Sequence, residues 1–213
     1  MNFEKLVQDF GAQPFFDLAS VVQLSGEARG TVLTQLHRWR RGGKILPLRR
    51  SMYTLADHYR RKPVNPTMLA NNLYHPSYIS GLWALGFYGL IPERVVTYTC
   101  VTTRVPRRFK NAFGHFEYRN VKLGFFFGYR VVVIQQDTVL LADPEKALVD
   151  LWHLGQGPWS AERISAMRFQ NQDVVDPAKL TQYVETFDSP RLLRAAEVWM
   201  DVARTEQEGT VQL

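Results

Sequence analysis

The segment 27–41 carries side chains that could contact nucleic acid. If it forms a helix, at about 100° per residue one face presents a set of hydroxyl and guanidinium groups, Thr31, Thr34, Arg38 and Arg41. Gln35 lies at the margin of this face, and Arg29 lies near the start of the helix. Such groups on a helix reach base edges and phosphates in the major groove of DNA. The pattern therefore predicts a DNA-recognition helix.

Two arginines follow this segment at the tip of a predicted hairpin. The glycine pair 42–43 ends the helix, and short apolar strands at 44–48 and 52–55 flank Arg49 and Arg50. Guanidinium groups at such a tip can lie along the DNA backbone or in the minor groove, where they add affinity without selecting sequence. A solvated charged face is the alternative for the helix alone, and the hairpin behind it favours DNA binding.

A second basic set follows further along the chain, with aromatic residues between its members. The basic residues are Arg104, Arg107, Arg108, Lys110 and Arg119, and the aromatic ones are Phe109, Phe113 and Phe116. Positive charge combined with aromatic rings can hold single-stranded nucleic acid by stacking. A strand that alternates Phe inward and Arg outward gives the same pattern. The sequence leaves both interpretations open.

Carboxylates and a lysine after the predicted strands could belong to a nuclease. In such an enzyme carboxylates hold a metal ion beside a lysine, and the glutamate and lysine lie one residue apart on a strand. Here Glu145 and Lys146 are adjacent, and Asp143 before Pro144 is typical of a helix start. The histidines and Cys100 show no metal-ligand spacing. We therefore expect no metal, no cofactor and no catalytic residue.

The first sixty residues are expected to position the recognition helix. Helices are predicted at 2–10 and 17–24, and Ser25 is the expected N-cap of the helix at 27–41. An apolar stripe that docks this helix on the rest of the unit is made by Val32, Leu36 and Trp39. Three helices followed by a hairpin predict a winged helix-turn-helix.

The rest of the chain is predicted to form a sheet followed by helices. A polar stretch with two prolines at 58–66 is the expected linker, which places a winged-helix domain at 1–62 and a second domain at 63–213. Helices are predicted at 67–73 and 77–88, and strands at 95–105, 115–121, 129–134 and 138–141. The strand connections are too short for crossover helices, which predicts an antiparallel sheet over about 95–142. With helices over about 143–207, the fold class is α+β.

Charge is divided unevenly along the 213 residues. Residues 1–63 carry 11 basic and 5 acidic side chains, residues 94–130 carry 8 and 1, and residues 131–213 carry 7 and 13. Two basic blocks suit polyanionic partners. The N-terminus lacks the pattern of a signal peptide, no apolar run is long enough for a membrane span, and a single cysteine fits a reducing compartment. We expect a cytoplasmic protein without a membrane partner.

Several ordered motifs resemble one known family. They are Pro76–Ser80, Ala84-Leu85, Tyr88–Glu93, Thr99–Arg104, Phe116–Arg119, Phe127–Tyr129 and Ala142–Leu148. In type and order they are similar to motifs of AbiEi-type antitoxins of abortive-infection systems, which defend against phage. The resemblance extends over about residues 10–154 and does not include the helical remainder.

This resemblance implies a bacterial or archaeal antitoxin of a type IV toxin–antitoxin system. In that family the winged helix represses its own operon by binding inverted repeats in the promoter. The C-terminal domain counteracts a nucleotidyltransferase-like toxin, without a tight complex between the two proteins. Carried over to this sequence, neutralisation falls on 76–213 and DNA binding on Thr31, Thr34, Arg38, Arg49 and Arg50. Two molecules are expected on an inverted repeat, as a dimer in solution or only on DNA.

Two other functions fit parts of the sequence. A winged-helix regulator without a toxin partner would use its second domain to sense a ligand or to dimerise. A nucleic-acid-processing enzyme would be built on the segment 94–146 and would depend on Mg²⁺ and on Asp143 or Glu145.

Overall fold

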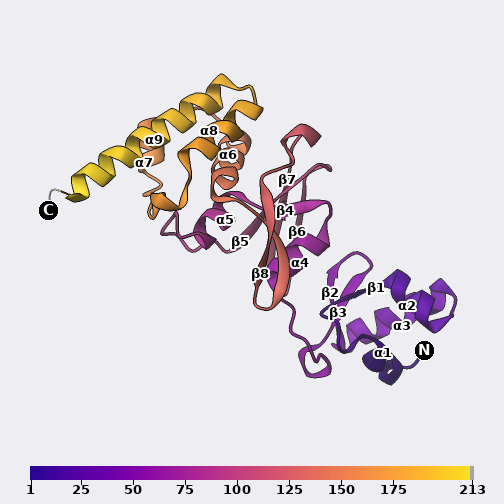
Figure 1. Cartoon of the computed structure of the whole chain (residues 1–213). Helices are drawn as coiled ribbons and strands as arrows, with labels where there is room; N and C mark the ends of the chain where they lie inside the picture. The colour runs from indigo at the N-terminus through magenta and orange to yellow at the C-terminus, as the bar shows by residue number, and fades with distance from the viewer. Residues whose placement is uncertain (212–213) are drawn as a thin grey trace.

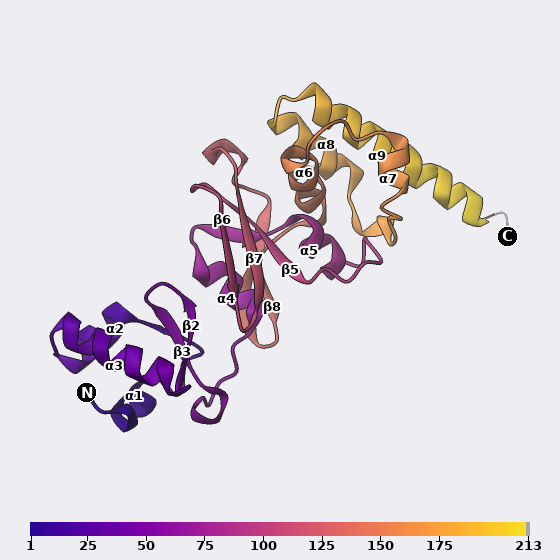
Figure 2. The same cartoon turned by 180° about the vertical axis from the view of Figure 1, so that it is seen from behind.

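The computed structural model describes residues 1–211, and the side chains of residues 1–205. Figures 1 and 2 show an elongated chain with a small unit at the N-terminal end, a sheet in the middle and helices at the other end. The chain contains both helices and strands, which agrees with the mixed α and β content of the predicted fold class. The last two residues of the predicted second domain, 212–213, lie outside the described residues.

The N-terminal unit (residues 1–59) contains three helices and a small sheet. The helices are α1 (Phe3–Phe10), α2 (Leu18–Ser25) and α3 (Arg29–Arg41), and the strands are β1 (Phe16–Asp17), β2 (Ile45–Arg49) and β3 (Met52–Leu55). The strands pair antiparallel in the order β1-β3-β2. Asn2 and Asp17 cap the first two helices by accepting backbone N–H bonds from Lys5 and Ser20, over 2.9 and 2.8 Å. The two-residue strand β1 is absent from our sequence prediction.

The larger sheet has six strands in the order β6-β7-β5-β4-β9-β8. Its strands are β4 (Ser77–Ile79), β5 (Thr97–Thr102), β6 (Arg107–Asn111), β7 (Gly114–Asn120), β8 (Tyr129–Ile134) and β9 (Asp137–Ala142). Three neighbouring pairs are antiparallel, namely β4–β5, β6–β7 and β8–β9. The sequence prediction contains the strands β8 and β9, but neither β4 nor β6. The pairs β5–β7 and β4–β9 are parallel, which corrects the prediction of a purely antiparallel sheet. The strand β6 reverses the chain at the edge, so β7 returns parallel to β5 without a crossover helix.

Six further helices surround this sheet. They are α4 (Pro66–Leu73), α5 (Gly81–Phe87), α6 (Pro144–Leu154), α7 (Ala161–Ser165), α8 (Pro177–Thr186) and α9 (Pro190–Val211), and short 3₁₀ turns lie at Asp57–Tyr59, Leu123–Phe125 and Gln172–Val174. The predicted helix 77–88 is wrong in its first part, because residues 77–79 form the central strand β4. Gly81, the first residue of α5, has a φ of 57°, which turns the chain from this strand into the helix.

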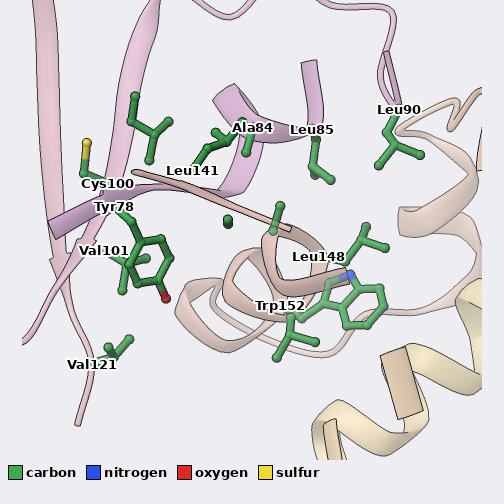
Figure 3. Close-up of a cluster of buried hydrophobic side chains, with 14 of the residues drawn as sticks. Tyr78, Ala84, Leu85, Leu90, Cys100, Val101, Val121, Leu141, Leu148 and Trp152 are labelled. Carbon is green, nitrogen blue, oxygen red and sulfur yellow. The ribbon is translucent and has the colours of Figure 1, made fainter. Parts of the chain in front are cut away.

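The two faces of the sheet carry different helices. Tyr118 on β7 donates its hydroxyl to the Ala70 carbonyl of α4, whereas Tyr78 on β4 donates to Asp150 of α6 over 3.0 Å. Strand register places these tyrosines on opposite faces, so α4 covers one face and α6 the other. Side chains from β4, β5, α5 and α6 meet in the larger core, among them Tyr78, Val101, Leu85, Leu148 and Trp152 (Figure 3).

The N-terminal unit rests on the larger sheet through its hairpin. Leu48 and Met52 of β2 and β3 are buried in the larger core, while ten other buried apolar residues of the unit, among them Leu6, Leu36 and Trp39, form a smaller core. Asn111 at the end of β6 donates its side-chain N–H to the Leu48 carbonyl over 3.1 Å. After the unit, Lys62 forms an ion pair with Asp137 of β9.

Among the described helices, none is long and apolar enough to cross a membrane.

Candidate nucleic-acid interface

The helix α3 has one buried and one exposed side. Val32, Leu36 and Trp39 are buried in the smaller core, as predicted. On the opposite side, the exposed residues are Thr31, Thr34, Arg38 and Arg41, and Arg29 is exposed at the start of the helix. The arrangement follows from an apolar stripe repeated every three to four residues, which leaves the other face to solvent. The helix therefore presents a cationic, hydroxyl-bearing surface.

The start of α3 differs from the prediction. The helix begins at Arg29, and Ala28 at its N-cap offers no side-chain acceptor. Ser25, the predicted N-cap, instead accepts the backbone N–H of Glu27 over 3.2 Å in the loop before the helix. The glycine Gly26, at a φ of 66°, ends α2 and separates the two helices. The backbone N–H groups in the first turn of α3 thus have no side-chain cap within the described residues.

Two polar residues of α3 make bonds inside the chain. The Thr34 hydroxyl donates to the Gly30 carbonyl one turn earlier over 3.0 Å, and can still accept a bond. The Gln35 amide donates to a carboxylate oxygen of Glu27 over 2.7 Å, and Gln35 is half-buried. Gln35 is therefore tied to the preceding loop, whereas Arg38 forms no ion pair with any side chain among residues 1–205.

The two arginines at the hairpin tip face different surroundings. Arg50 is exposed, and Ser51 beside it holds a positive φ of 62° that closes the turn. Arg49 is half-buried and donates Nη1 to the Arg50 carbonyl over 3.2 Å. Burial raises the pKa of the Tyr118 phenol on the larger sheet, and the nearby positive charge of Arg49 partly opposes this rise. Arg50 therefore faces solvent, while Arg49 faces the larger sheet.

The second basic set is divided between the two faces of the sheet. Arg104 and Arg107 lie over the Tyr74 ring, with guanidinium carbons 4.4 and 5.6 Å from its centre. Arg108 and Arg119 lie on the other face and share one oxygen of Glu117, at 3.0 and 3.4 Å. Lys110 is exposed on β6. The five side chains predicted as one basic surface therefore form two separate groups plus Lys110.

The aromatic residues of this region pack inside the protein. Phe109 lies against Tyr74 and Tyr118, with ring centres 6.1 and 5.7 Å apart, and the ring of Phe116 stacks on Tyr98 at 5.1 Å. Phe113 is half-buried beneath the guanidinium of Arg60, 5.4 Å from its ring centre. These contacts agree with the part of the alternative in which Phe points inward. Arg107 does not alternate with Phe109, because both lie on the face of β6 that contacts Tyr74.

No model of a known protein family matches this sequence, and no curated protein matches it. The resemblance to AbiEi-type antitoxins therefore rests on the sequence motifs alone.

The carboxylates considered for a nuclease are bound to cations of the same chain. Asp143 accepts from Lys179 at 3.0 Å, from Arg130 at 3.3 Å and from the Tyr183 hydroxyl at 3.1 Å. Glu145 is buried, with one oxygen 3.2 Å from Lys179 and the other accepting the backbone N–H of residue 176 over 2.9 Å. Burial lowers the pKa of Lys179, but the bonds to these two carboxylates outweigh it and raise the pKa. Among the described residues, no three potential metal ligands lie together.

A buried polar network on α6 is absent from our sequence prediction. Lys146 donates to Asp150 and, over 2.9 Å, to the Tyr78 hydroxyl, and both charged side chains are fully buried. Asp150 also accepts from Ser80 over 2.7 Å. Burial lowers the pKa of Lys146, opposed in part by the charge of Asp150. The sequence did contain a signal for this network: a lysine and an aspartate lie four residues apart among apolar neighbours. Residues at this spacing lie next to each other on the surface of a helix.

Proposed function

We propose that the protein is a promoter-binding antitoxin of the AbiEi type whose first 62 residues act as a winged helix-turn-helix. The observation that carries the DNA-binding part is the two-sided helix α3. Its apolar side is anchored by Val32, Leu36 and Trp39, so its cationic side is held outward at a fixed angle. The exposed Arg50 follows on the neighbouring hairpin.

The exposed groups of α3 suit different parts of a DNA site. Thr34 and Arg38, in the middle of the exposed face, are proposed to contact base edges in the major groove. Arg29 and Thr31, beside the uncapped first turn, are proposed to contact a phosphate, since free N–H groups at a helix start attract anions. Arg41 and Arg50 are proposed to contact the backbone on either side.

Two members of the predicted DNA-binding set and two of the second basic set take narrower roles. Gln35 is bound to Glu27 and would have to exchange that bond to reach a base. Arg49 is proposed to hold the hairpin against the larger sheet, because it is half-buried there. In the second set, Lys110 precedes Asn111, which bonds to that hairpin, whereas Arg107 lies at the other end of β6. Both are exposed and could add phosphate contacts.

The antitoxin part of the proposal is supported by the order of the motifs between Pro76 and Leu148. It is tested by co-expression with a nucleotidyltransferase-like protein encoded next to its gene. Rescue of growth by the full chain supports the antitoxin role. Growth arrest that the chain does not relieve would leave a DNA-binding regulator without a toxin partner.

Gel shifts of the full chain on the region upstream of its gene, beside a random duplex, test the DNA-binding part. Arg38→Ala is expected to lose about 1–3 kcal/mol of binding free energy on the specific duplex and little on the random one. Arg50→Ala is expected to weaken both duplexes alike and to flatten the salt dependence, which for about six phosphate contacts has a log–log slope near −5.

Arg194→Ala on α9 is the matched control, since it removes an exposed arginine from the far end of the molecule. It should change neither affinity nor slope. Equal losses for Arg38→Ala on the specific and random duplexes, or equal losses for all three variants, would contradict the recognition role of α3.

A further inference from the structure

The two edges of the larger sheet are protected to different degrees. The edge strand β6 carries Arg107, Arg108 and Lys110 and is contacted by the β2–β3 hairpin. The other edge strand, β8, exposes Val131 to 62% and Val133 to 72%, and among the described residues nothing pairs with its outer side. In Figure 1 the β8–β9 hairpin extends from the helical end of the molecule toward the N-terminal unit. Soluble proteins usually protect such an edge, because its free N–H and C=O groups pair with other strands.

The outward backbone groups of β8 can be identified from its partner strand. The turn at Gln135 and Gln136, with φ values of 50° and 67°, is a two-residue turn that makes Ile134 and Asp137 a hydrogen-bonded pair. Pairs alternate along an antiparallel ladder, so the backbone groups of Val133 and Val131 point away from β9.

Contacts of Leu140 support this assignment independently. Leu140 lies opposite Val131 in the ladder. Its backbone N–H donates to the Asn71 side chain over 2.7 Å, and its carbonyl accepts from Asn71 over 3.2 Å. Leu140 therefore directs its backbone away from β8, and Val131 directs its own toward solvent.

We propose that two copies of the chain associate through β8, pairing antiparallel about a two-fold axis at Val132 so that two six-stranded sheets become one. In this register Val131 of each copy lies opposite Val133 of the other, and these two pairs exchange about four hydrogen bonds. Arg130 lies opposite Ile134 of the other copy, so no like charges meet. The most exposed apolar side chains of the strand become covered.

A second copy is the occupant, because the two-fold register brings the exposed Val131 of each copy beside the exposed Val133 of the other and places no like charges opposite each other. The strand places no charge at its two outward positions that would select a different partner. The association needs no DNA, so it goes beyond the proposed function and can fail without affecting it.

Sedimentation velocity of the full chain without DNA, over a concentration series, tests the association. The wild type should shift from monomer to dimer as concentration rises. Val131→Pro removes an N–H that points to solvent, so it keeps the β8–β9 ladder but deletes two hydrogen bonds per dimer, which should weaken association by about tenfold. Val133→Lys should weaken it too, and Val96→Lys, with the same 72% exposure at another site, should not.

Disulfide trapping tests the register. In the proposed pairing the two copies of residue 132 face each other as a non-hydrogen-bonded pair, with a Cα separation that a disulfide can span. Val132→Cys should form a covalent dimer on mild oxidation, whereas Val96→Cys should not. The only native cysteine, Cys100, is buried and does not interfere. A monomeric wild type at every concentration, or equal cross-linking of the two cysteine variants, overturns the proposal.

Discussion

Replacing Asp150 with asparagine removes the charge that compensates Lys146 inside the protein. Both side chains of this pair are fully buried on α6, and the carboxylate also accepts from Tyr78 and Ser80. Asparagine keeps the shape but leaves the ammonium group buried without an opposite charge. Breaking a buried pair in this way costs about 3–5 kcal/mol of unfolding free energy.

The chain contains a matched control for this substitution. Lys5 and Asp9 on α1 have the same residue types and the same spacing, with the two charged atoms 2.9 Å apart, but Lys5 is 57% exposed. Asp9→Asn should therefore cost only about 0.3–0.5 kcal/mol. Urea unfolding of both variants at pH 7, followed by tryptophan fluorescence and circular dichroism, measures the two losses.

A second test comes from the pH dependence of the unfolding free energy. Burial already lowers the pKa of Lys146, and loss of Asp150 lowers it further. The pKa of a lysine in the unfolded chain is about 10.4. Where the pKa in the folded protein is lower than this, the unfolding free energy rises as the pH increases from the folded to the unfolded pKa. The deficit of Asp150→Asn should therefore shrink from pH 7 to pH 10. The explanation is refuted if Asp150→Asn and Asp9→Asn cost the same, or if the deficit does not change with pH.

Two further predictions concern the same helical region. Burial lowers the pKa of His153, so the neutral form is favoured in the folded state, and the unfolding free energy should fall as pH drops below about 6.5. His153→Phe should reduce that fall when unfolding at pH 7.5 and 5.5 is compared, and an unchanged difference would refute it. Gly128 has a φ of 70°, and a methyl group on its Cα would lie 2.9 Å from the Tyr183 ring. Gly128→Ala should therefore lower the unfolding free energy measured in urea by about 2–4 kcal/mol. Gly26→Ala, with a φ of 66° and open space around it, should cost only about 1 kcal/mol, and equal losses would show that crowding at Gly128 is not the cause.

Local patterns were sufficient to predict α3 and its orientation. Val32, Leu36 and Trp39 repeat at helical spacing, and the structure buries all three. The pair Asp143-Pro144 located the start of α6 as well. In each case the signal lies within a few residues of the element that it defines.

Features that depend on residues distant in the sequence could not be predicted from local patterns. The strand β4 is three residues long and is held by β5 and β9, which follow it later in the chain, so nothing near Ser77 shows that it leaves the helical pattern. The parallel pairs arise from strand order, which local sequence does not encode. Arg49 and Arg50 are adjacent and identical in type, and only the neighbouring sheet makes one face inward.

The β2–β3 hairpin is shared between two hydrophobic cores. Ile45 and Leu55 belong to the smaller core, and Leu48 and Met52 to the larger. A fragment cut after residue 62 would therefore lose the cover over two apolar side chains and tend to aggregate. In the intact protein the same hairpin is packed into both cores, so if α3 binds DNA as proposed, a rotation of the N-terminal unit would also displace side chains in the core of the larger sheet.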